Sequence, residues 1–271
     1  MRPLRTLLTS ALLLGLALPA LAIDASETDA RAVMEAVEAQ ETGDRQTSRI
    51  EITVTDKAGR ERKRSVVTRS MDFEGGNRQL ILFEAPADVR NAGLLSVDYD
   101  DSSKTDDQWL FLPSLSKSSR ISGSDRSGSF MGTDLTYADM GGRDLDDYEY
   151  VMVDANAEVD GEPCWIIESR AVSDKERDET GYLKSQSWIS KEKMLPIQVK
   201  AWVIEGKMLK YTRFDEIKQI NGIWVPHSVV VRTVKGSEVQ STSTLTFSDV
   251  AFDQEDVTQD DFTERRLERG L

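Results

Sequence analysis

The second half of the chain is a series of strand-length segments, most of them separated by a turn signal. Asp160-Gly161, Asn221-Gly222 and Lys235-Gly236 are turn signals of this kind, and an Asx-Gly pair between two such runs favours a two-residue hairpin. The runs themselves cover residues 148–153, 164–172, 183–190, 197–204, 208–217, 225–234 and 239–247. A meander with this spacing predicts one large antiparallel sheet, curled or closed.

Strand signals continue into the first half of the chain. Ile50, Ile52 and Val54 alternate with polar residues, and the same alternation recurs near residues 95–99. Such period-two patterns indicate strands with one buried face. No linker or change of composition separates the halves, so we expect residues 23–271 to form a single, mainly β domain with a few helices.

A short amphipathic helix is predicted before the first strand. Ser26 provides a capping residue, with Asp29 three positions later in a weaker form of the capping box. The apolar residues that follow recur at helical spacing and are Ala30, Val33, Met34 and Val37. They form one stripe, which we expect to pack against the sheet.

Residues 116–142 interrupt the strand pattern with a segment rich in serine and glycine. Glycines at 128, 132, 141 and 142 bracket an apolar cluster that consists of Phe130, Met131, Leu135 and Tyr137. Thr133 or Asp134 is placed to cap a short helix in this segment. Two interpretations stay open: a mobile lid with glycine hinges, or a surface loop whose apolar side chains fill the core.

The N-terminus has the pattern of a secretory signal peptide. Arg2 and Arg5 precede the apolar stretch 7–18, and Ala20-Leu21-Ala22 supplies a cleavage pattern. We therefore predict that residues 1–22 are removed and that the protein is periplasmic. No cysteine follows the cleavage point, so lipid attachment there is not available, and we expect no stable membrane anchor.

Charge limits the partners. The formal net charge is −14 at pH 7, which argues against nucleic acid and against anionic membrane surfaces as electrostatic partners. The acidic stretch 253–261 is interpreted as a solvated face.

No set of residues predicts catalysis or metal binding. Ser114 and Lys117 match the S-x-x-K motif of penicillin-binding enzymes, but its companion motifs are missing. His227 is the only histidine and Cys164 the only cysteine, and Cys164 lies in an apolar strand pattern. The usual nitrogen and sulfur ligands of zinc are thus lacking. We expect no enzyme activity, no catalytic residue, no metal and no cofactor.

Three motifs resemble a known family. They are the stretch 83–95, which begins Phe-Glu-Ala-Pro-Ala-Asp-Val-Arg and ends Gly-Leu-Leu; the stretch 107–121, which begins Asp-Gln-Trp-Leu-Phe-Leu-Pro-Ser-Leu and ends Arg-Ile; and the stretch 128–140, Gly-Ser-Phe-Met-Gly-Thr-Asp-Leu-Thr-Tyr-Ala-Asp-Met. Over nearly all of residues 23–271 the chain resembles the LolA-like outer-membrane lipoprotein-sorting proteins. The motifs are those of an uncharacterised branch, not of the lipoprotein carrier itself.

The resemblance implies an incomplete β-barrel whose open side is covered by the N-terminal helix and by a short helical lid. It implies an apolar cavity for acyl chains between them. The residues that we expect to line this cavity and its lid are Val33, Met34, Val37, Trp109, Phe111, Phe130, Met131, Leu135, Tyr137, Trp165 and Trp188. Arg120 is the candidate polar contact of lid or ligand. The sequence by itself favours the tryptophans as core residues, which is the commoner use of aromatic side chains.

Two functions follow. The first is a non-enzymatic periplasmic carrier that binds the acyl chains of a lipoprotein or lipid in an apolar cavity, for outer-membrane lipoprotein sorting or lipid transport, with an inner-membrane transporter as a further candidate partner. The second is an accessory or sensor subunit that docks onto an envelope transporter of the RND or MMPL type, or onto a regulator. An open cavity favours the first function, and a cavity filled by side chains favours the second.

Overall fold

The computed structural model describes residues 23–101 and 104–271. The predicted signal peptide, residues 1–22, lies outside the described residues. None of the helices within the described ranges combines the length and the apolar character needed to cross a bilayer.

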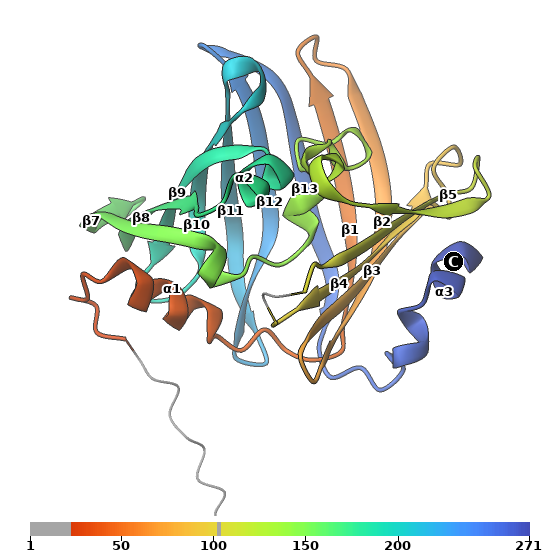
Figure 1. Cartoon of the computed structure of the whole chain (residues 1–271), viewed down its shortest axis with the longest axis horizontal. Helices are drawn as coiled ribbons and strands as arrows, with labels where there is room; N and C mark the ends of the chain where they lie inside the picture. Colours follow the sequence, from red (N-terminus) through yellow and green to blue (C-terminus); the bar gives the residue numbers. More distant parts are fainter. Residues whose placement is uncertain (1–22, 102–103) are drawn as a thin grey trace, which may run out of the picture.

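In the described residues the strands form one antiparallel sheet of 13 strands (Figure 1). Its order is β6-β5-β4-β3-β2-β1-β13-β12-β11-β10-β9-β8-β7, so nearly every strand pairs with its neighbours in sequence. The strands are β1 (Gln46–Asp56), β2 (Glu61–Phe73), β3 (Gly76–Ala85), β4 (Gly93–Tyr99), β5 (Asp107–Leu112), β6 (Lys117–Ile121), β7 (Tyr148–Val159), β8 (Glu162–Ala171), β9 (Tyr182–Ser190), β10 (Pro196–Val203), β11 (Met208–Ile220), β12 (Ile223–Lys235) and β13 (Glu238–Ala251).

The sheet curls but does not close. Strands β6 and β7 are its two edges and do not pair with each other in the described strand order. Large twisted sheets curl in this way because each strand adds to the right-handed twist. The predicted incomplete barrel is therefore confirmed, with a concave face that is open to the viewer in Figure 1.

The connection between the two edges explains how the concave face is covered. Because β6 and β7 follow each other in sequence but lie at opposite edges, residues 122–147 have to cross from one edge to the other. They cross the concave face (Figure 1) as short 3₁₀ turns, which include η1 (Gly123–Ser127), η2 (Phe130–Gly132), η3 (Ala138–Met140) and η4 (Leu145–Asp147). We call residues 123–142 the covering segment. The short helix predicted to begin at Thr133 or Asp134 is replaced by bends and by η3.

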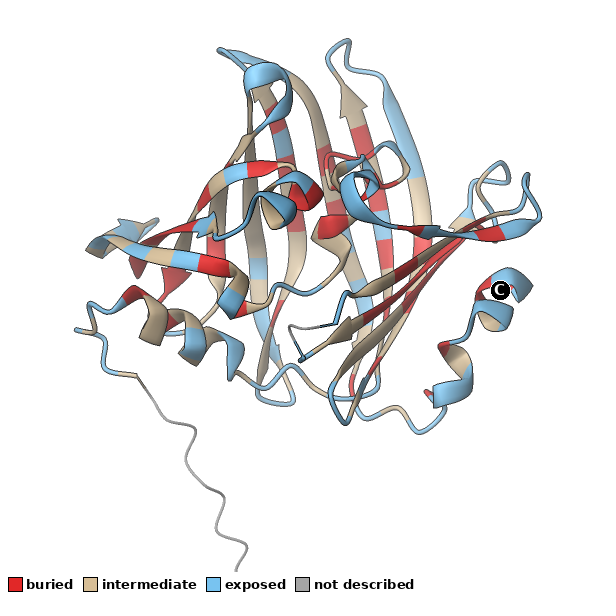
Figure 2. Ribbon diagram, viewed as in Figure 1, coloured by how far each residue is buried: buried red, intermediate tan, exposed pale blue. Residues whose placement is uncertain are grey.

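Both faces of β3 are buried, and each faces its own core. Ile81 and Phe83 belong to a cluster that includes the covering segment, whereas Leu80 and Leu82 belong to a second cluster that includes the C-terminal residues. Successive side chains of a strand point to opposite faces. Figure 2 shows buried residues along the strands of the sheet.

Helix α1 (Ala30–Glu38) packs against the β7–β9 end of the sheet (Figure 1). Its predicted stripe is correct, because Val33 is fully buried and Met34 and Val37 pack beside it. The predicted capping residue, Ser26, is wrong. Asp29 is the N-cap, and its carboxylate accepts hydrogen bonds from the backbone N–H groups of Arg31 and Ala32. Ser26 instead donates to Asp24.

The C-terminal residues cover the outer face of the sheet. They run through η6 (Gln259–Asp261) and α3 (Glu264–Arg269), and they insert Val257, Phe262 and Leu267 into the second core. The acidic stretch is therefore not simply a solvated face. Asp256 and Asp261 form ion pairs with Arg69 at 3.0 and 3.6 Å.

A short helix α2 (Asp174–Thr180) lies between β8 and β9.

Candidate ligand-binding site

Phe130 is the central contact of the covering segment with the sheet. Its side chain is 2 % exposed, and its ring centroid lies 6.0 Å from that of Phe83 on β3 and 5.7 Å from that of Tyr137. Met131, Leu135 and Tyr137 pack around the same core. The apolar residues of the segment thus fill the middle of the concave face.

The local backbone makes this insertion possible. The Phe130 N–H donates to the Leu135 carbonyl at 2.7 Å, and the Thr133 hydroxyl donates to the Phe130 carbonyl at 2.8 Å. Gly132 has a φ of 74°, in the left-handed region that glycine adopts without strain. A tight loop of residues 129–136 therefore presents Phe130 toward the sheet.

Asp134 anchors the segment to the sheet through buried polar bonds. Its carboxylate accepts hydrogen bonds from the hydroxyls of Thr233 at 2.5 Å, Ser243 at 2.7 Å and Ser241. Its backbone N–H donates to Ser243 at 2.9 Å. A buried carboxylate is stable only when such donors replace its hydration, so β12 and β13 are built to receive this one aspartate.

A pocket of about 500 Å³ opens beside the segment on the concave side, and we call it the concave pocket. Its volume is in the range of sites for small ligands. Its apolar wall consists of Leu135, Val203, Ile204 and Met208. Its other walls are polar, with hydroxyls from the covering segment and from β12 and β13.

Lys210 is the buried cation of this pocket. Its side chain is 12 % exposed, and its Nζ donates to the Tyr182 hydroxyl at 2.9 Å. The Tyr182 hydroxyl in turn donates to Asp139 of the covering segment at 2.8 Å. Burial lowers the pKa of Lys210 and raises the pKa of Tyr182. The chain Lys210–Tyr182–Asp139 therefore ties the pocket wall to the segment.

A second polar cluster holds the two ends of the segment. Arg126 in η1 lies 3.5 Å from Asp106 near β5 and 3.5 Å from Glu179 in α2. Asp98 accepts a hydrogen bond from the backbone N–H of Gly142. In this part of the described chain Asp98 Oδ1 and Arg126 Nε have no hydrogen-bond partner, so the cluster is incompletely satisfied.

Burial, together with the neighbouring Asp106, raises the pKa of Asp98 to about 6. A carboxyl with a raised folded-state pKa destabilises the protein when ionised. This cost is present above pH 6 and is relieved as the pH falls through 6 toward the unfolded value near 4.

We therefore expect Asp98→Asn to raise the free energy of unfolding at pH 7.5 by about 2 kcal/mol and to have little effect at pH 4. Urea unfolding of both proteins at the two pH values measures the difference. Asp100→Asn, on an exposed neighbour, is the control and should change neither value. An equal effect of Asp98→Asn at both pH values would contradict the role of ionisation.

The structure brings together only part of the predicted site. Phe130, Met131, Leu135 and Tyr137 meet on the concave face as expected. Val33, Met34 and Val37 meet Trp165 in a separate cluster under α1, where Trp165 is fully buried and donates to the Glu27 carbonyl at 2.9 Å.

The other predicted residues lie on the opposite face. Trp109 and Phe111 pack in the second core with the C-terminal residues. Arg120, across from Trp109 in the sheet, is half exposed and pairs with Asp107. Trp188 pairs in register with Ile166 and Gln198, which places it on the face opposite Trp165. None of these four contacts the covering segment among the interactions of the described residues.

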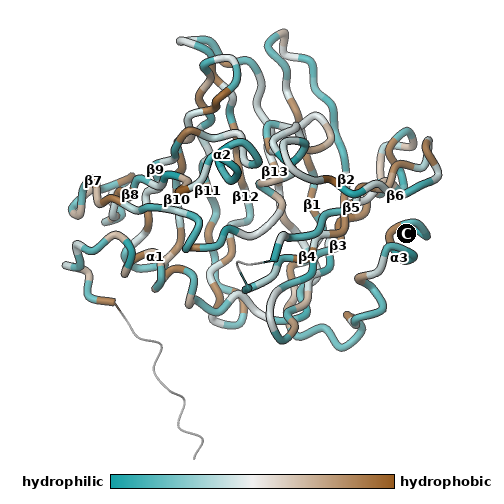
Figure 3. Tube along the Cα trace, in the orientation of Figure 1, coloured by the Kyte–Doolittle hydropathy of each residue, from teal (hydrophilic) through white to brown (hydrophobic). Residues whose placement is uncertain are grey.

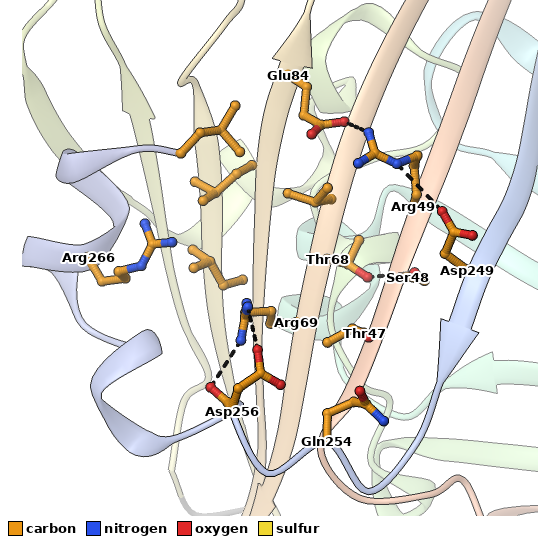
Figure 4. A pocket seen from close by; sticks show the side chains of 14 residues that line it. Thr47, Ser48, Arg49, Thr68, Arg69, Glu84, Asp249, Gln254, Asp256 and Arg266 are labelled. Carbon is orange, nitrogen blue, oxygen red and sulfur yellow. Dashed lines mark hydrogen bonds and ion pairs between the residues drawn. The ribbon is translucent and has the colours of Figure 1, made fainter.

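A second pocket of about 420 Å³ lies on the outer face between β1–β3 and the C-terminal residues (Figure 4). Three arginines line it, but carboxylates already pair with all of them: Arg49 with Glu84 and Asp249, Arg69 with Asp256, and Arg266 with Asp261. Its apolar floor consists of Val67, Leu80 and Leu82, which belong to the second core. We interpret it as an irregular gap beside an ion-pair network.

Sites for metal or thiol chemistry are not evident. Within the described ranges no group of three or more His, Cys, Asp or Glu side chains is placed to hold a metal ion. Burial raises the pKa of Cys164 to about 11, so its thiol is a poor nucleophile at neutral pH.

Comparison with known proteins agrees with this architecture. Residues 75–269 match the model of a family described as "Uncharacterized protein". A search of curated proteins finds no match. A solved outer membrane lipoprotein-sorting protein domain from Vibrio parahaemolyticus is 24 % identical, with 91 % of this chain and 100 % of that chain covered and a TM-score of 0.79.

Two further solved structures are similar. A DUF1329 family protein from Desulfovibrio piger is 27 % identical, with 88 % of this chain and 97 % of that chain covered and a TM-score of 0.79. A LolA superfamily protein from Nitrosomonas europaea is 21 % identical, with 88 % and 98 % covered and a TM-score of 0.65. The chain therefore belongs to the uncharacterised family whose model it matches, and it has the fold of LolA-like lipoprotein-sorting proteins.

Proposed function

We propose that the protein is a non-enzymatic periplasmic carrier that binds the acyl chains of a lipoprotein or lipid on its concave face. The observation that carries this proposal is the covering segment: a separate stretch of chain closes an apolar sheet face, and the concave pocket opens beside it. The likeness to solved lipoprotein-sorting domains supports the same ligand class, and the pattern of residues 1–22 supports the location.

Closure and ligand binding are balanced in free energy. Fully burying a side chain such as Phe or Leu gains about 1.5–3 kcal/mol. Because Phe130 is buried and the other three apolar residues of the segment are only partly buried, lifting all four costs at most roughly 6–12 kcal/mol. An acyl chain of about 16 carbons gains on the order of 10 kcal/mol on burial. Because the two quantities are similar, the segment can yield to a ligand and can also expel it.

The concave pocket is the entry point in this account. Leu135, Val203 and Met208 offer the first apolar contacts, and Phe130 then gives way as the chain moves under the segment. Lys210 is a donor for the carbonyl or head group of the ligand, since an ammonium has three donors and Lys210 uses one of them on the Tyr182 hydroxyl, whose own proton is donated to Asp139.

An accessory subunit that docks onto an envelope transporter is the second candidate. It is favoured by the apolar side chains of the covering segment, which fill the middle of the concave face, and by β7, which is an edge strand with Val151 and Val153 exposed at 58 % and 49 %. Edge strands present backbone groups that a partner strand can pair with.

Native mass spectrometry with added palmitoylated lipopeptide tests the carrier function. We expect one adduct per protein, and we expect Leu135→Asp to reduce it at least tenfold because a charge then lines the apolar wall. Ile204→Asp, at the half-exposed rim, is a second variant that leaves the core intact. Leu115→Asp is the control, since Leu115 is 64 % exposed and lies outside the pocket. No adduct with the unmodified protein would contradict the carrier and favour the accessory subunit.

A further inference from the structure

Three turns lie together at one end of the strands of the curled sheet. We call this end the basic edge; it is distinct from the edge strands β6 and β7. The three turns join β1 to β2, β10 to β11 and β12 to β13. The register places them side by side, because Asp56 at the end of β1 pairs with Ser241 on β13, and Met208 at the start of β11 pairs with Lys235 at the end of β12. This edge is at the top of Figure 1, where the hairpins project beyond the rest of the sheet.

The β1–β2 hairpin at this edge is strongly basic in an acidic protein. Residues 56–64 contain five cations, Lys57, Arg60, Arg62, Lys63 and Arg64, against two carboxylates. All but Arg64 are exposed, and Figure 3 shows the hydrophilic tip. Lys57 pairs with Glu238, Arg60 with Asp56 and Lys63 with Glu61, but exposed ion pairs are weak and exchange readily for other anions.

Apolar side chains accompany the charges. Ile204 and Val239 are 39 % and 46 % exposed and lie at the same edge. Ile204 and Glu205 of the β10–β11 turn also line the concave pocket. The concave pocket therefore extends to the same end of the sheet as the basic hairpin.

The hairpin also contacts the covering segment directly. Arg62 donates to the Gly132 carbonyl at 3.4 Å, and Arg64 donates to the Met131 carbonyl. These two arginines thus join the basic edge to the loop that carries Phe130.

We propose that this edge docks onto anionic phospholipid head groups, so that the end of the concave pocket formed by Ile204 and Glu205 faces the bilayer. Cations backed by a few exposed apolar side chains are the surface that such a membrane attracts. The negative charge of the whole chain does not oppose this docking at physiological salt, because charges more than about 8 Å away are largely screened. Arg62 and Arg64, when drawn to phosphate, release the carbonyls of Met131 and Gly132 and loosen the segment.

Vesicle co-sedimentation tests the docking. The protein should bind vesicles that contain phosphatidylglycerol and not vesicles of phosphatidylcholine alone, and high salt should abolish the binding. The triple variant Lys57→Gln, Arg60→Gln, Lys63→Gln should bind about 100-fold more weakly, at about fivefold per cation. It spares Arg62 and Arg64, which contact the segment.

The matched control removes three exposed cations elsewhere, Lys218→Gln, Arg265→Gln and Arg269→Gln, and should bind like the unmodified protein. Equal loss in both triple variants, or no preference for anionic vesicles, would overturn the proposal, and the second outcome would assign the edge to an acidic protein instead. The role of docking, which is to bring the concave pocket to the bilayer for exchange of an acyl chain, rests on the proposed carrier function. Vesicle binding itself is measured without acyl ligand. The two proposals can therefore fail separately.

Discussion

Phe130→Ala should bind acyl ligands more tightly than the unmodified protein, by about 10- to 100-fold, while its free energy of unfolding falls by about 3–5 kcal/mol. The reason is that Phe130, 2 % exposed, occupies the apolar face that the ligand needs. Removing its ring leaves a cavity in the concave core and weakens closure of the segment. A titration with a fluorescent fatty acid and a urea unfolding curve give the two quantities.

Phe262→Ala separates this effect from general destabilisation. Phe262 is 6 % exposed in the core on the outer face, so its loss should cost similar stability and leave acyl affinity unchanged. If both alanine variants bind ligand alike, Phe130 does not compete with the acyl chain, and the competition model is wrong.

Asp134→Ala should release the covering segment. The substitution leaves the hydroxyls of Thr233, Ser241 and Ser243 without the carboxylate that they donate to. Each unsatisfied buried donor costs about 1–3 kcal/mol, so we expect a loss of at least about 3 kcal/mol. Limited proteolysis should cleave residues 123–142 many times faster, because the segment then opens locally before the sheet unfolds.

Asp125→Ala is the control for this variant. Asp125 lies in the same segment but is exposed, so its replacement should change the free energy of unfolding by no more than about 0.5 kcal/mol. Equal protease resistance of the Asp134 variant and the unmodified protein would show that Phe130, not the polar anchor, holds the segment.

The sequence predicts the sheet well because strand periodicity is a local property. Ile50, Ile52 and Val54 are all buried on one face, as their alternation requires. The turn signals at Asp160-Gly161, Asn221-Gly222 and Lys235-Gly236 each separate two consecutive strands of the sheet. The stripe of α1 is likewise read from spacing alone.

Strand periodicity does not show which face of the sheet a set of apolar residues lies on, or what covers that face. Periodicity shows that Trp109 and Phe111 share a face, but only the tertiary arrangement decides that the C-terminal residues cover it. Those residues bury Val257, Phe262 and Leu267, whose spacing of five residues matches neither the period of a helix nor that of a strand. The same limit applies to Trp188: the sequence does not show the strand register, and the register places Trp188 on the face opposite Trp165.

The polar half of the candidate site carries almost no sequence signal. Lys210 on β11 has the pattern of a strand residue that faces solvent, and it is buried only because the covering segment crosses above it. Asp134 lies within the motif 128–140, but its three hydroxyl donors are about 100 residues later in the chain. Such long-range pairings depend on the curl of the sheet.

The most direct test of the central claim is photo-crosslinking with a diazirine-labelled palmitoyl probe, followed by peptide mapping. Binding on the concave face predicts labels in residues 130–137 and around Met208, which unlabelled palmitate suppresses. Labels confined to the outer pocket, for example at Leu80 or Leu82, or labels that unlabelled palmitate does not suppress, would contradict the account.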